Sequence, residues 1–176
     1  ELSDKWIISK ANKVAADVTE NIDKFELGLA AEKIYDFAWS QFCDWYIEMV
    51  KPRLYGEDDE AKNAALYTLT YVLEKILKLL HPFMPFITEE IYSYLGKEEK
   101  IIVAQWPHYD ENENFEKEEQ QMEIVMEAVR SIRNSRAEMN VPPSKKATVM
   151  VVADGKVREA IDAAKIYIKT LASASE

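Results

Sequence analysis

The stretch LLHPFMPFITEEIY, residues 79–92, ends one apolar helical pattern and starts another. Pro82 stops the preceding helix near Leu80, because a proline disfavours the α conformation in the residue before it. Pro85 fits the first turn of the next helix, where its missing N–H needs no partner. Glu89 and Glu90 then lie in the first turns, near the positive end of the helix dipole. The stretch predicts a rigid corner between two helices, packed into a bundle by Phe83, Phe86, Ile87 and Ile91.

Apolar residues repeat at helical spacing on both sides of this corner. The first predicted helix starts at Ser3 or Asp4, and the second spans about Glu26 to Lys51 and ends before Pro52. The third follows the YGEDDE turn, with Asp58 or Asp59 as its cap. The helix before the corner uses Ala65, Leu69, Val72, Ile76 and Leu79 as its seam. Beyond the corner, a fifth helix carries Met122, Val125, Val129 and Ile132 and ends before Val141-Pro142-Pro143.

The C-terminal part changes period. Ala147 to Ala153 is rich in β-branched residues and predicts a strand, followed after Asp154-Gly155 by one amphipathic helix. A single strand makes no sheet, so its partner is either the short extended run Ile101–Val103 or a strand beyond residue 176. The acidic DENENFEKEEQQME segment (110–123) predicts a solvated loop. The expected fold is mainly α: an antiparallel helix bundle over residues 1–140, then the start of a small α/β subdomain over residues 141–176.

Composition narrows the possible functions. The 176 residues are 48% hydrophobic and 31% charged, which is ordinary for a folded soluble domain. One cysteine, Cys43 among aromatic neighbours, excludes a disulfide framework and fits a cytoplasmic location. No signal segment or membrane span is expected. The net charge of −10 disfavours autonomous nucleic-acid binding through the phosphate backbone, which needs basic groups.

The sequence contains no recognisable catalytic or metal centre. His81 and His108 lie beside prolines, 27 positions apart, without cysteines or a Glu-x-x-His pattern, so structural roles are favoured over metal binding. Glu89 and Glu90 are adjacent and would point in different directions on a helix, which disfavours a shared acid–base role. No phosphate-binding glycine loop and no nucleophile motif is found. We expect no cofactor or metal in this segment.

Several residues are chemically suited to RNA. Glu48 ends a polar stripe of the second helix, where its carboxylate can accept from the exocyclic amino group of cytosine. Arg130, Arg133 and Arg136 are three apart on the fifth helix and favour internal ion pairs with the acidic stripe of the second helix over phosphate contacts. Lys145 and Lys146 fit a phosphate contact or a solvated turn equally well.

These stretches resemble a known family. LLHPFMPFITEEIY is similar to a signature of the helical anticodon-binding domain of class I aminoacyl-tRNA synthetases for valine, isoleucine and leucine. FCDWYIEMVKPRLY (42–55) resembles the valine type in particular. LSDKWIISKAN at the start, VAQWP (103–107) and RSIRNSRAEMNVPPSKK (130–146) are similar to the same family, in the same order.

The resemblance implies a non-catalytic segment that binds the anticodon stem-loop of tRNA-Val for the catalytic and editing domains of a longer chain, which would use ATP and Mg²⁺. It places anticodon contacts at Ile47 and Glu48. Lys51 and Arg53 are added as neighbours able to contact phosphates or base edges. Valine anticodons end in A-C, which suits a glutamate acceptor. Alternatives are the isoleucine type and a helical protein-interaction scaffold that binds no RNA.

Overall fold

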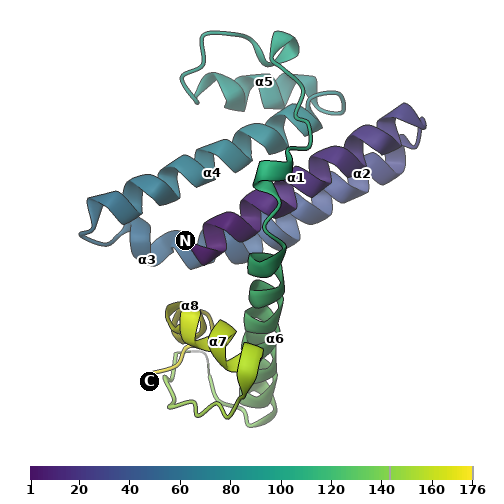
Figure 1. Cartoon of the computed structure of the whole chain (residues 1–176). Helices are drawn as coiled ribbons and strands as arrows, with labels where there is room; N and C mark the ends of the chain where they lie inside the picture. Colours follow the sequence, from purple (N-terminus) through teal and green to yellow (C-terminus); the bar gives the residue numbers. More distant parts are fainter. Residues whose placement is uncertain (143, 176) are drawn as a thin grey trace. The chain divides into compact units, whose positions relative to one another are not determined.

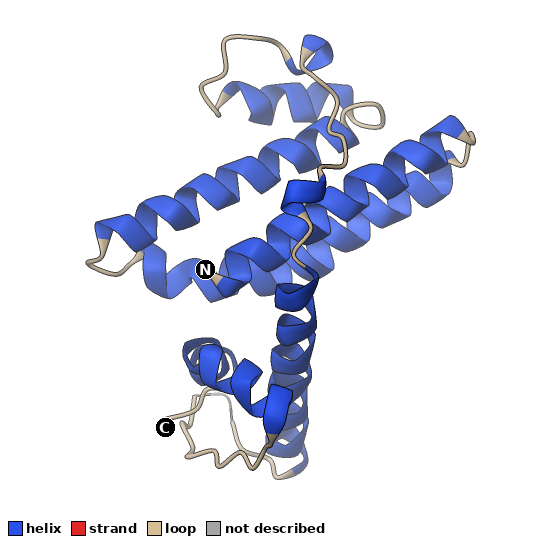
Figure 2. Cartoon of the chain, in the orientation of Figure 1, coloured by secondary structure: helices blue, strands red, loops and turns tan. Residues whose placement is uncertain are grey.

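The computed structural model describes residues 1–142 and 144–175, and helices joined by short loops make up most of it (Figures 1 and 2). Two compact units are present and are described separately. The central unit is Ile7–Asn114, and the terminal unit is Glu1–Trp6 with Phe115–Glu176. The domain boundary predicted after residue 140 falls inside the terminal unit, and it stays a prediction. The expectation of a mainly helical fold is confirmed; Pro143 and Glu176, parts of the predicted subdomain, lie outside the described residues.

Most of the helices belong to the central unit. Its elements are most of α1 (Leu2–Asp23), then α2 (Leu27–Asp36), the π-helix η1 (Phe37–Ile47), α3 (Glu48–Leu54), α4 (Asp59–Leu80), α5 (Pro85–Ser93) and the short 3₁₀ helices η2 (Ile101–Val103) and η3 (Glu111–Glu113). The apolar stripes read from the sequence form its core. One cluster joins α1, α2 and the end of α4 through Ala15, Val18, Ala30, Ile34 and Leu79.

The second predicted helix is present but longer and differently wound. α2, η1 and α3 form one uninterrupted helical run, with the wider π winding where large residues crowd: Phe37, Phe42, Trp45 and Tyr46 are all buried there. The prediction that this helix ends before Pro52 is wrong, since Pro52 lies inside α3 and the helix ends at Leu54. α3 packs against α4, and this tertiary contact offsets the one hydrogen bond that a proline removes.

The corner at residues 79–92 has the predicted backbone and an unpredicted packing. α4 ends at Leu80, and Pro85 occupies the first turn of α5, as expected. The predicted burial of three apolar residues is wrong: Phe86 is 91% exposed, Ile87 48% and Ile91 37%. Thr88 and Tyr92 form the buried face of α5 instead. Apolar spacing alone could not distinguish these two faces, because both carry large side chains.

The run Ile101–Val103 is a 3₁₀ turn, so the predicted extended conformation is wrong. Ile101 inserts into a small core with Leu77 and Tyr92, while Ile102 and Val103 are mostly exposed. A turn needs no more than one buried side chain, here that of Ile101, whereas a strand would need a second strand to pair with.

The terminal unit contains α6 (Glu116–Glu138), α7 (Gly155–Ala163) and α8 (Lys165–Leu171). The seam of α6 follows the sequence pattern, with Met122, Val125 and Val129 fully buried. The loop predicted for residues 110–123 is wrong beyond Phe115, because α6 already starts at Glu116. Its acidic first turn is favoured by the positive end of the helix dipole.

The partial α/β subdomain is not supported. Within the described residues no strand occurs; the segment Ala147–Ala153 forms a single parallel bridge, Ala147 with Ala174. Met150 and Val152 are almost fully exposed, so β-branched composition without a second strand to pair with has not produced a sheet. The single helix predicted after Gly155 is broken at Ala164, whose φ of −118° and ψ of 17° separate α7 from α8.

Candidate nucleic-acid interface

The predicted contact residues lie where η1 passes into α3, in the central unit. Ile47 is the last residue of η1 and is half-buried, and Glu48 is the first residue of α3. Lys51 and Arg53 lie in the last turn of α3. The helix therefore brings these four residues within two turns of each other. They do not share one face, and their surroundings differ.

Glu48 and Lys51 form an ion pair between Lys51 Nζ and Glu48 Oε1. Their side chains are 44% and 47% exposed, so solvent screens the pair and its contribution to stability is small, about 0–1 kcal/mol. A carboxylate accepts several hydrogen bonds, so Glu48 can accept another donor while Lys51 is nearby. The pair is thus accessible and easily rearranged by a charged ligand.

Arg53 makes a contact within the protein, and its predicted contact with a phosphate or base edge stays a prediction. Its Nε donates to the carbonyl oxygen of Ala61 at 3.3 Å, across the turn that joins α3 to α4. The side chain is half-buried. Arg53 therefore holds two helices together, and its guanidinium is less accessible to a phosphate than the ammonium group of Lys51.

The turn after α3 is rigidly built. The Tyr55 N–H donates to the carbonyl of Lys51 at 3.1 Å, and the Gly56 N–H donates to that of Arg53 at 3.3 Å. A Cβ on Gly56 would lie 2.9 Å from the Pro52 carbonyl oxygen, which is too close for any other residue without a shift of the backbone. Asp58 then caps α4 by accepting from the N–H groups of Glu60 and Ala61, as the sequence predicts.

Tyr55, which the sequence reasoning missed, extends the predicted site. It is 83% exposed and lies four residues after Lys51 and seven after Glu48, so the three share one face of α3. We call Glu48, Lys51 and Tyr55 the α3 face. The sequence did carry a signal for this exposed ring, namely a tyrosine directly before the glycine that follows the helix. A side chain at a helix end has few neighbours to cover it.

Two further aromatic side chains lie earlier on the same helical run. Tyr35 is 63% exposed and Trp39 58% exposed, four residues apart. Trp45, by contrast, is buried, which confirms the prediction that it belongs to the core. The exposed carboxylate Asp36 directly follows Tyr35, and the exposed Asp44 lies five residues after Trp39, so this part of the run is less suited to a polyanion than the α3 face.

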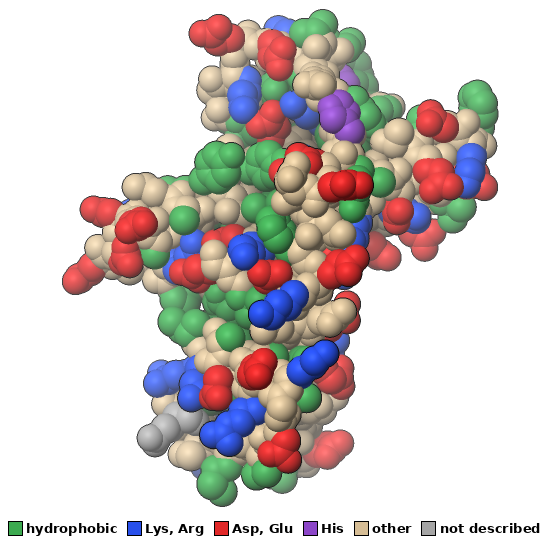
Figure 3. Space-filling model, in the orientation of Figure 1, with side chains coloured by type: hydrophobic (Ala, Val, Ile, Leu, Met, Phe, Trp, Pro, Cys, Tyr) green, Lys and Arg blue, Asp and Glu red, His purple; other side chains and the backbone are tan. Residues whose placement is uncertain are grey.

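Charge is mixed around the α3 face. The loop that follows it and the first residues of α4 carry four exposed carboxylates, from Glu57 to Glu60. Figure 3 shows carboxylates and basic side chains interspersed over the face it draws, in agreement with the net charge of −10. This mixed charge favours ligands that are bound through individual local contacts over ligands bound through many phosphates at once.

The arginines of α6 hold the terminal unit together. Arg133 Nε donates to the Leu171 carbonyl at 2.9 Å. Arg136 donates from its two Nη groups to three carbonyls, those of Pro142 (3.1 Å), Lys145 and Ser173. Arg130 lies 3.6 Å from Glu127 in an exposed pair. Arg133 and Arg136 thus bind backbone carbonyl groups, a kind of partner that was not expected from the sequence.

The two histidines have hydrogen-bond partners within the central unit. His81 Nδ1 lies 2.8 Å from Thr88 Oγ1, and His108 Nε2 lies 3.0 Å from Gln105 Nε2. No cluster of three or more His, Cys, Asp or Glu side chains suited to a metal ion is found in residues 1–142 and 144–175. None of the helices in that part of the chain has the length and hydropathy of a membrane span.

Comparison with known proteins gives one consistent family. Residues 4–151 match the family described as the anticodon-binding domain of tRNA ligase. The chain is 54% identical over 176 residues to a valine–tRNA ligase of Clostridium perfringens, 52% identical to that of Clostridium tetani and 43% identical to that of Bacillus anthracis. Each match covers 99% of this chain and 20% of the relative, so the chain spans about a fifth of the length of these proteins.

Proposed function

Because the chain belongs to the family of anticodon-binding domains of tRNA ligases, we propose that it binds the anticodon stem-loop of tRNA-Val as part of a valine–tRNA ligase. The proposed site is the α3 face together with Ile47. The observation that carries the proposal is that three suitable groups lie together on this face. They are an accessible acceptor (Glu48), a cation (Lys51) and an exposed aromatic ring (Tyr55).

The chemistry of these groups suits unpaired bases. Proteins read single-stranded RNA by stacking splayed bases on aromatic rings and by hydrogen bonds to base edges. Glu48 accepts from the exocyclic amino group of the terminal cytosine of a valine anticodon, and Ile47 gives apolar contact to a neighbouring base. Tyr55 stacks a base, and Lys51 leaves Glu48 to neutralise a phosphate. Arg53 supports this site by fixing the turn through Ala61.

The proposal extends to a longer polypeptide. Aminoacylation with valine, the use of ATP and Mg²⁺, and any editing would belong to other domains of that chain, acting in the cytoplasm. The present segment contributes selection of the tRNA, and we expect it to have no aminoacylation activity by itself. The residues of the proposed site, from Ile47 to Tyr55, bind the tRNA and take no part in the chemical reaction.

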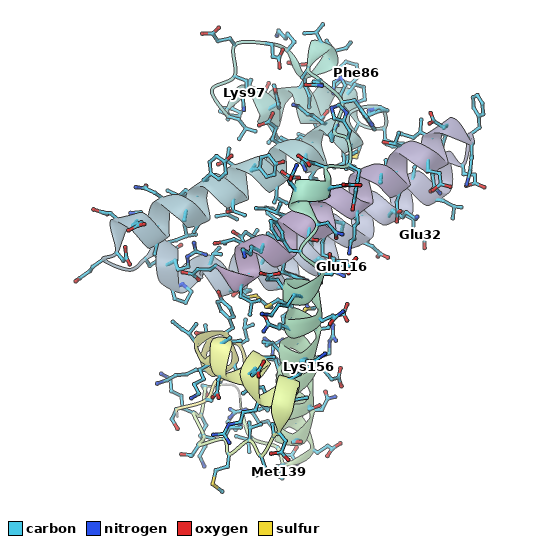
Figure 4. The ribbon with its side chains drawn as sticks, viewed as in Figure 1. Glu32, Phe86, Lys97, Glu116, Met139 and Lys156 are labelled. Atoms are coloured by element: carbon cyan, nitrogen blue, oxygen red, sulfur yellow. The ribbon has the colours of Figure 1, made fainter. Side chains whose placement is uncertain are left out.

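Fluorescence anisotropy tests the proposal directly. A labelled tRNA-Val anticodon stem-loop is titrated with the chain at low salt, beside a stem-loop in which the last two anticodon bases are exchanged. We expect tighter binding of the natural loop, and about ten-fold weaker binding by Glu48→Gln, which keeps the size of the side chain but weakens its acceptor. Glu32→Gln, an exposed carboxylate of α2 away from the site (Figure 4), is the matched control and should bind like the wild type.

Three other outcomes would contradict the proposal in different ways. Equal binding of both loops would remove the reading of the anticodon from this segment. Preference for an isoleucine anticodon loop would favour an isoleucine-type ligase, despite the valine-type relatives. Absence of binding at low salt would leave the acidic bundle as a protein-interaction scaffold.

A further inference from the structure

The corner between α4 and α5 is held rigidly from one side. His81 Nδ1 and Thr88 Oγ1 lie 2.8 Å apart, and the Thr88 hydroxyl lies 2.8 Å from the Met84 carbonyl oxygen. Thr88 is 1% exposed and Tyr92 1% exposed. Tyr92 packs with Leu77 and Ile101 in one small core. The orientation of α5 about its own axis is therefore fixed within the central unit, and so is the identity of the face that it turns outward.

The outward face of α5 has the pattern of a helix-packing seam. Met84, Ile87, Ile91 and Tyr94 follow one another at steps of three, four and three residues, the spacing of one helix face. Their exposed fractions are 48, 48, 37 and 78%. Phe86, labelled in Figure 4, borders this seam and is 91% exposed. We call these five residues the α5 seam.

A contiguous apolar face of this kind is unusual on a protein that works alone. Single exposed apolar residues are common, but a row of large ones with helical spacing marks a surface that another element covers. The same spacing predicts from the sequence that Phe86, Ile87 and Ile91 are packed in the core. The pattern is that of a buried face, and the element that buries it is not among the described residues of the central unit.

Charge restricts what can cover the seam. The only charged residues of α5 are Glu89 and Glu90, and the helix carries no lysine or arginine. Glu90 lies beside the seam and accepts a hydrogen bond from the Tyr94 hydroxyl at 3.0 Å, whereas Glu89 lies on the other side of the helix from Ile87 and Ile91. The Glu90 carboxylate repels RNA phosphates and anionic lipid headgroups. It favours a protein surface with an apolar row flanked by lysine or arginine. The α5 seam is thereby chemically distinct from the α3 face.

We propose that the α5 seam is an intramolecular docking face for an amphipathic helix with basic flanks from the remaining part of a tRNA ligase chain. The curated relatives that match this chain are about five times as long, which supplies such a partner in the same polypeptide. The inference rests on the proposed membership of a longer ligase, and it does not depend on anticodon binding. In that longer chain, the seam would connect the anticodon-binding bundle firmly to its neighbour.

Thiol labelling in two proteins tests this inference. Phe86→Cys is made in a Cys43→Ala background, in the present chain and in the full-length ligase, and its rate of reaction with a maleimide is measured. We expect labelling at least ten-fold slower in the ligase than in the present chain. Glu57→Cys, on the exposed loop after α3, is the control and should react at the same rate in both. Equal rates for Phe86→Cys in the two proteins would overturn the inference.

A second variant makes the test independent of the cysteine background. Ile87→Asp with Ile91→Asp should lower the melting temperature of the ligase by several degrees more than that of the present chain, because in the present chain both positions are already partly exposed. No change in the ligase would contradict docking.

Sedimentation velocity tests whether a second copy of the chain covers the seam instead. A dimer of the present chain that the double variant abolishes would assign the seam to a second copy and overturn the proposal. Failure of anticodon binding would alter none of these readouts.

Discussion

The side-chain amide of Asn12 in α1 forms two hydrogen bonds with the backbone of Asp110. Its Oδ1 accepts from the Asp110 N–H at 2.9 Å, and its Nδ2 donates to the Asp110 carbonyl at 2.7 Å. A second link joins Trp106 Nε1 to the Thr19 hydroxyl at 2.9 Å. Together these bonds fasten the segment 104–114 along α1, and this long connection is ordered although its regular structure is limited to the short η3.

Asn12→Ala should therefore destabilise the chain. Asn12 is fully buried, and its removal leaves two backbone groups of Asp110 without their partners, a loss of about 2–3 kcal/mol in the free energy of unfolding. Urea denaturation measures this change. Asn63→Ala, at an exposed position of α4, is the control and should be neutral or slightly stabilising because alanine favours helices.

Gly56→Ala should destabilise the turn after α3. The added Cβ would lie 2.9 Å from the Pro52 carbonyl oxygen, so the backbone must move, at an expected loss of about 1–2 kcal/mol. Gly28→Ala is the matched control, since nothing lies within 4 Å of its Cβ position and it is inside α2. That substitution should be neutral or stabilise by up to about 0.5 kcal/mol, as alanine replaces glycine in the first turn of a helix. Equal effects of the two substitutions would argue against the close approach at Gly56.

Arg136→Met should loosen the terminal unit. The guanidinium donates to three backbone carbonyls, and methionine keeps its apolar stem but none of its donors. We expect a loss of about 1–3 kcal/mol and faster hydrogen exchange in α8. Arg158→Met, which affects an exposed 3.7 Å pair with Asp162 in the same unit, should change stability by less than about 0.5 kcal/mol.

Tyr167 gives the terminal unit a dependence on alkaline pH. Burial, and then the neighbouring Glu1, raise the pKa of the Tyr167 phenol to about 12, while a hydrogen bond from Ser3 opposes this rise. In the folded protein the phenol therefore keeps its proton at a pH where the unfolded chain has lost it, so stability falls as pH rises from about 10 to about 12. The expected loss over that window is about 2–3 kcal/mol relative to Tyr167→Phe, measured by urea denaturation at each pH. Parallel curves for the two proteins would contradict the assigned shift.

Tyr55→Leu should weaken binding of the anticodon stem-loop about ten-fold, because stacking of a base on an aromatic ring contributes about 1–3 kcal/mol. Tyr55→Phe keeps the ring and should bind like the wild type. Tyr94→Leu, at a tyrosine of similar exposure in the same unit, is the control for a general loss of aromatic surface. If Tyr55→Leu bound as tightly as Tyr55→Phe, the stacking role of Tyr55 would be excluded while that of Glu48 would remain.

The positions of the helices followed from the sequence where periodicity and end signals agreed. The seam of α4, its Asp58 cap and its end before Pro82 are local properties: spacing at 3.6 residues, an oxygen that accepts from free N–H groups, and a ring that excludes the next turn. Ile47, Glu48 and Lys51 were likewise placed together, since neighbours on one helix stay neighbours in any tertiary structure. The residue roles proposed for them remain to be tested by binding.

The errors have a common physical origin. Pro52 was expected to end a helix that continues to Leu54, because packing of α3 on α4 outweighs a local preference. Arg136 was expected to pair with carboxylates of the second helix, but it donates to the backbone carbonyls of Pro142, Lys145 and Ser173, which only the folding of the terminal unit brings within reach. The strand expected at Ala147–Ala153 needs a second strand, which local composition cannot supply.

The sequence by itself determined that this chain is a set of amphipathic helices of the anticodon-binding family, because helix spacing, caps and long motifs are properties of consecutive residues. Only the tertiary structure decided which face of each helix is covered. It buried Thr88 and Tyr92 and left Phe86 and Ile91 exposed, and it exposed Tyr55 beside Lys51. Burial depends on contacts between residues far apart in the chain. Where one helix has two apolar faces, the spacing of its residues does not show which face makes those contacts.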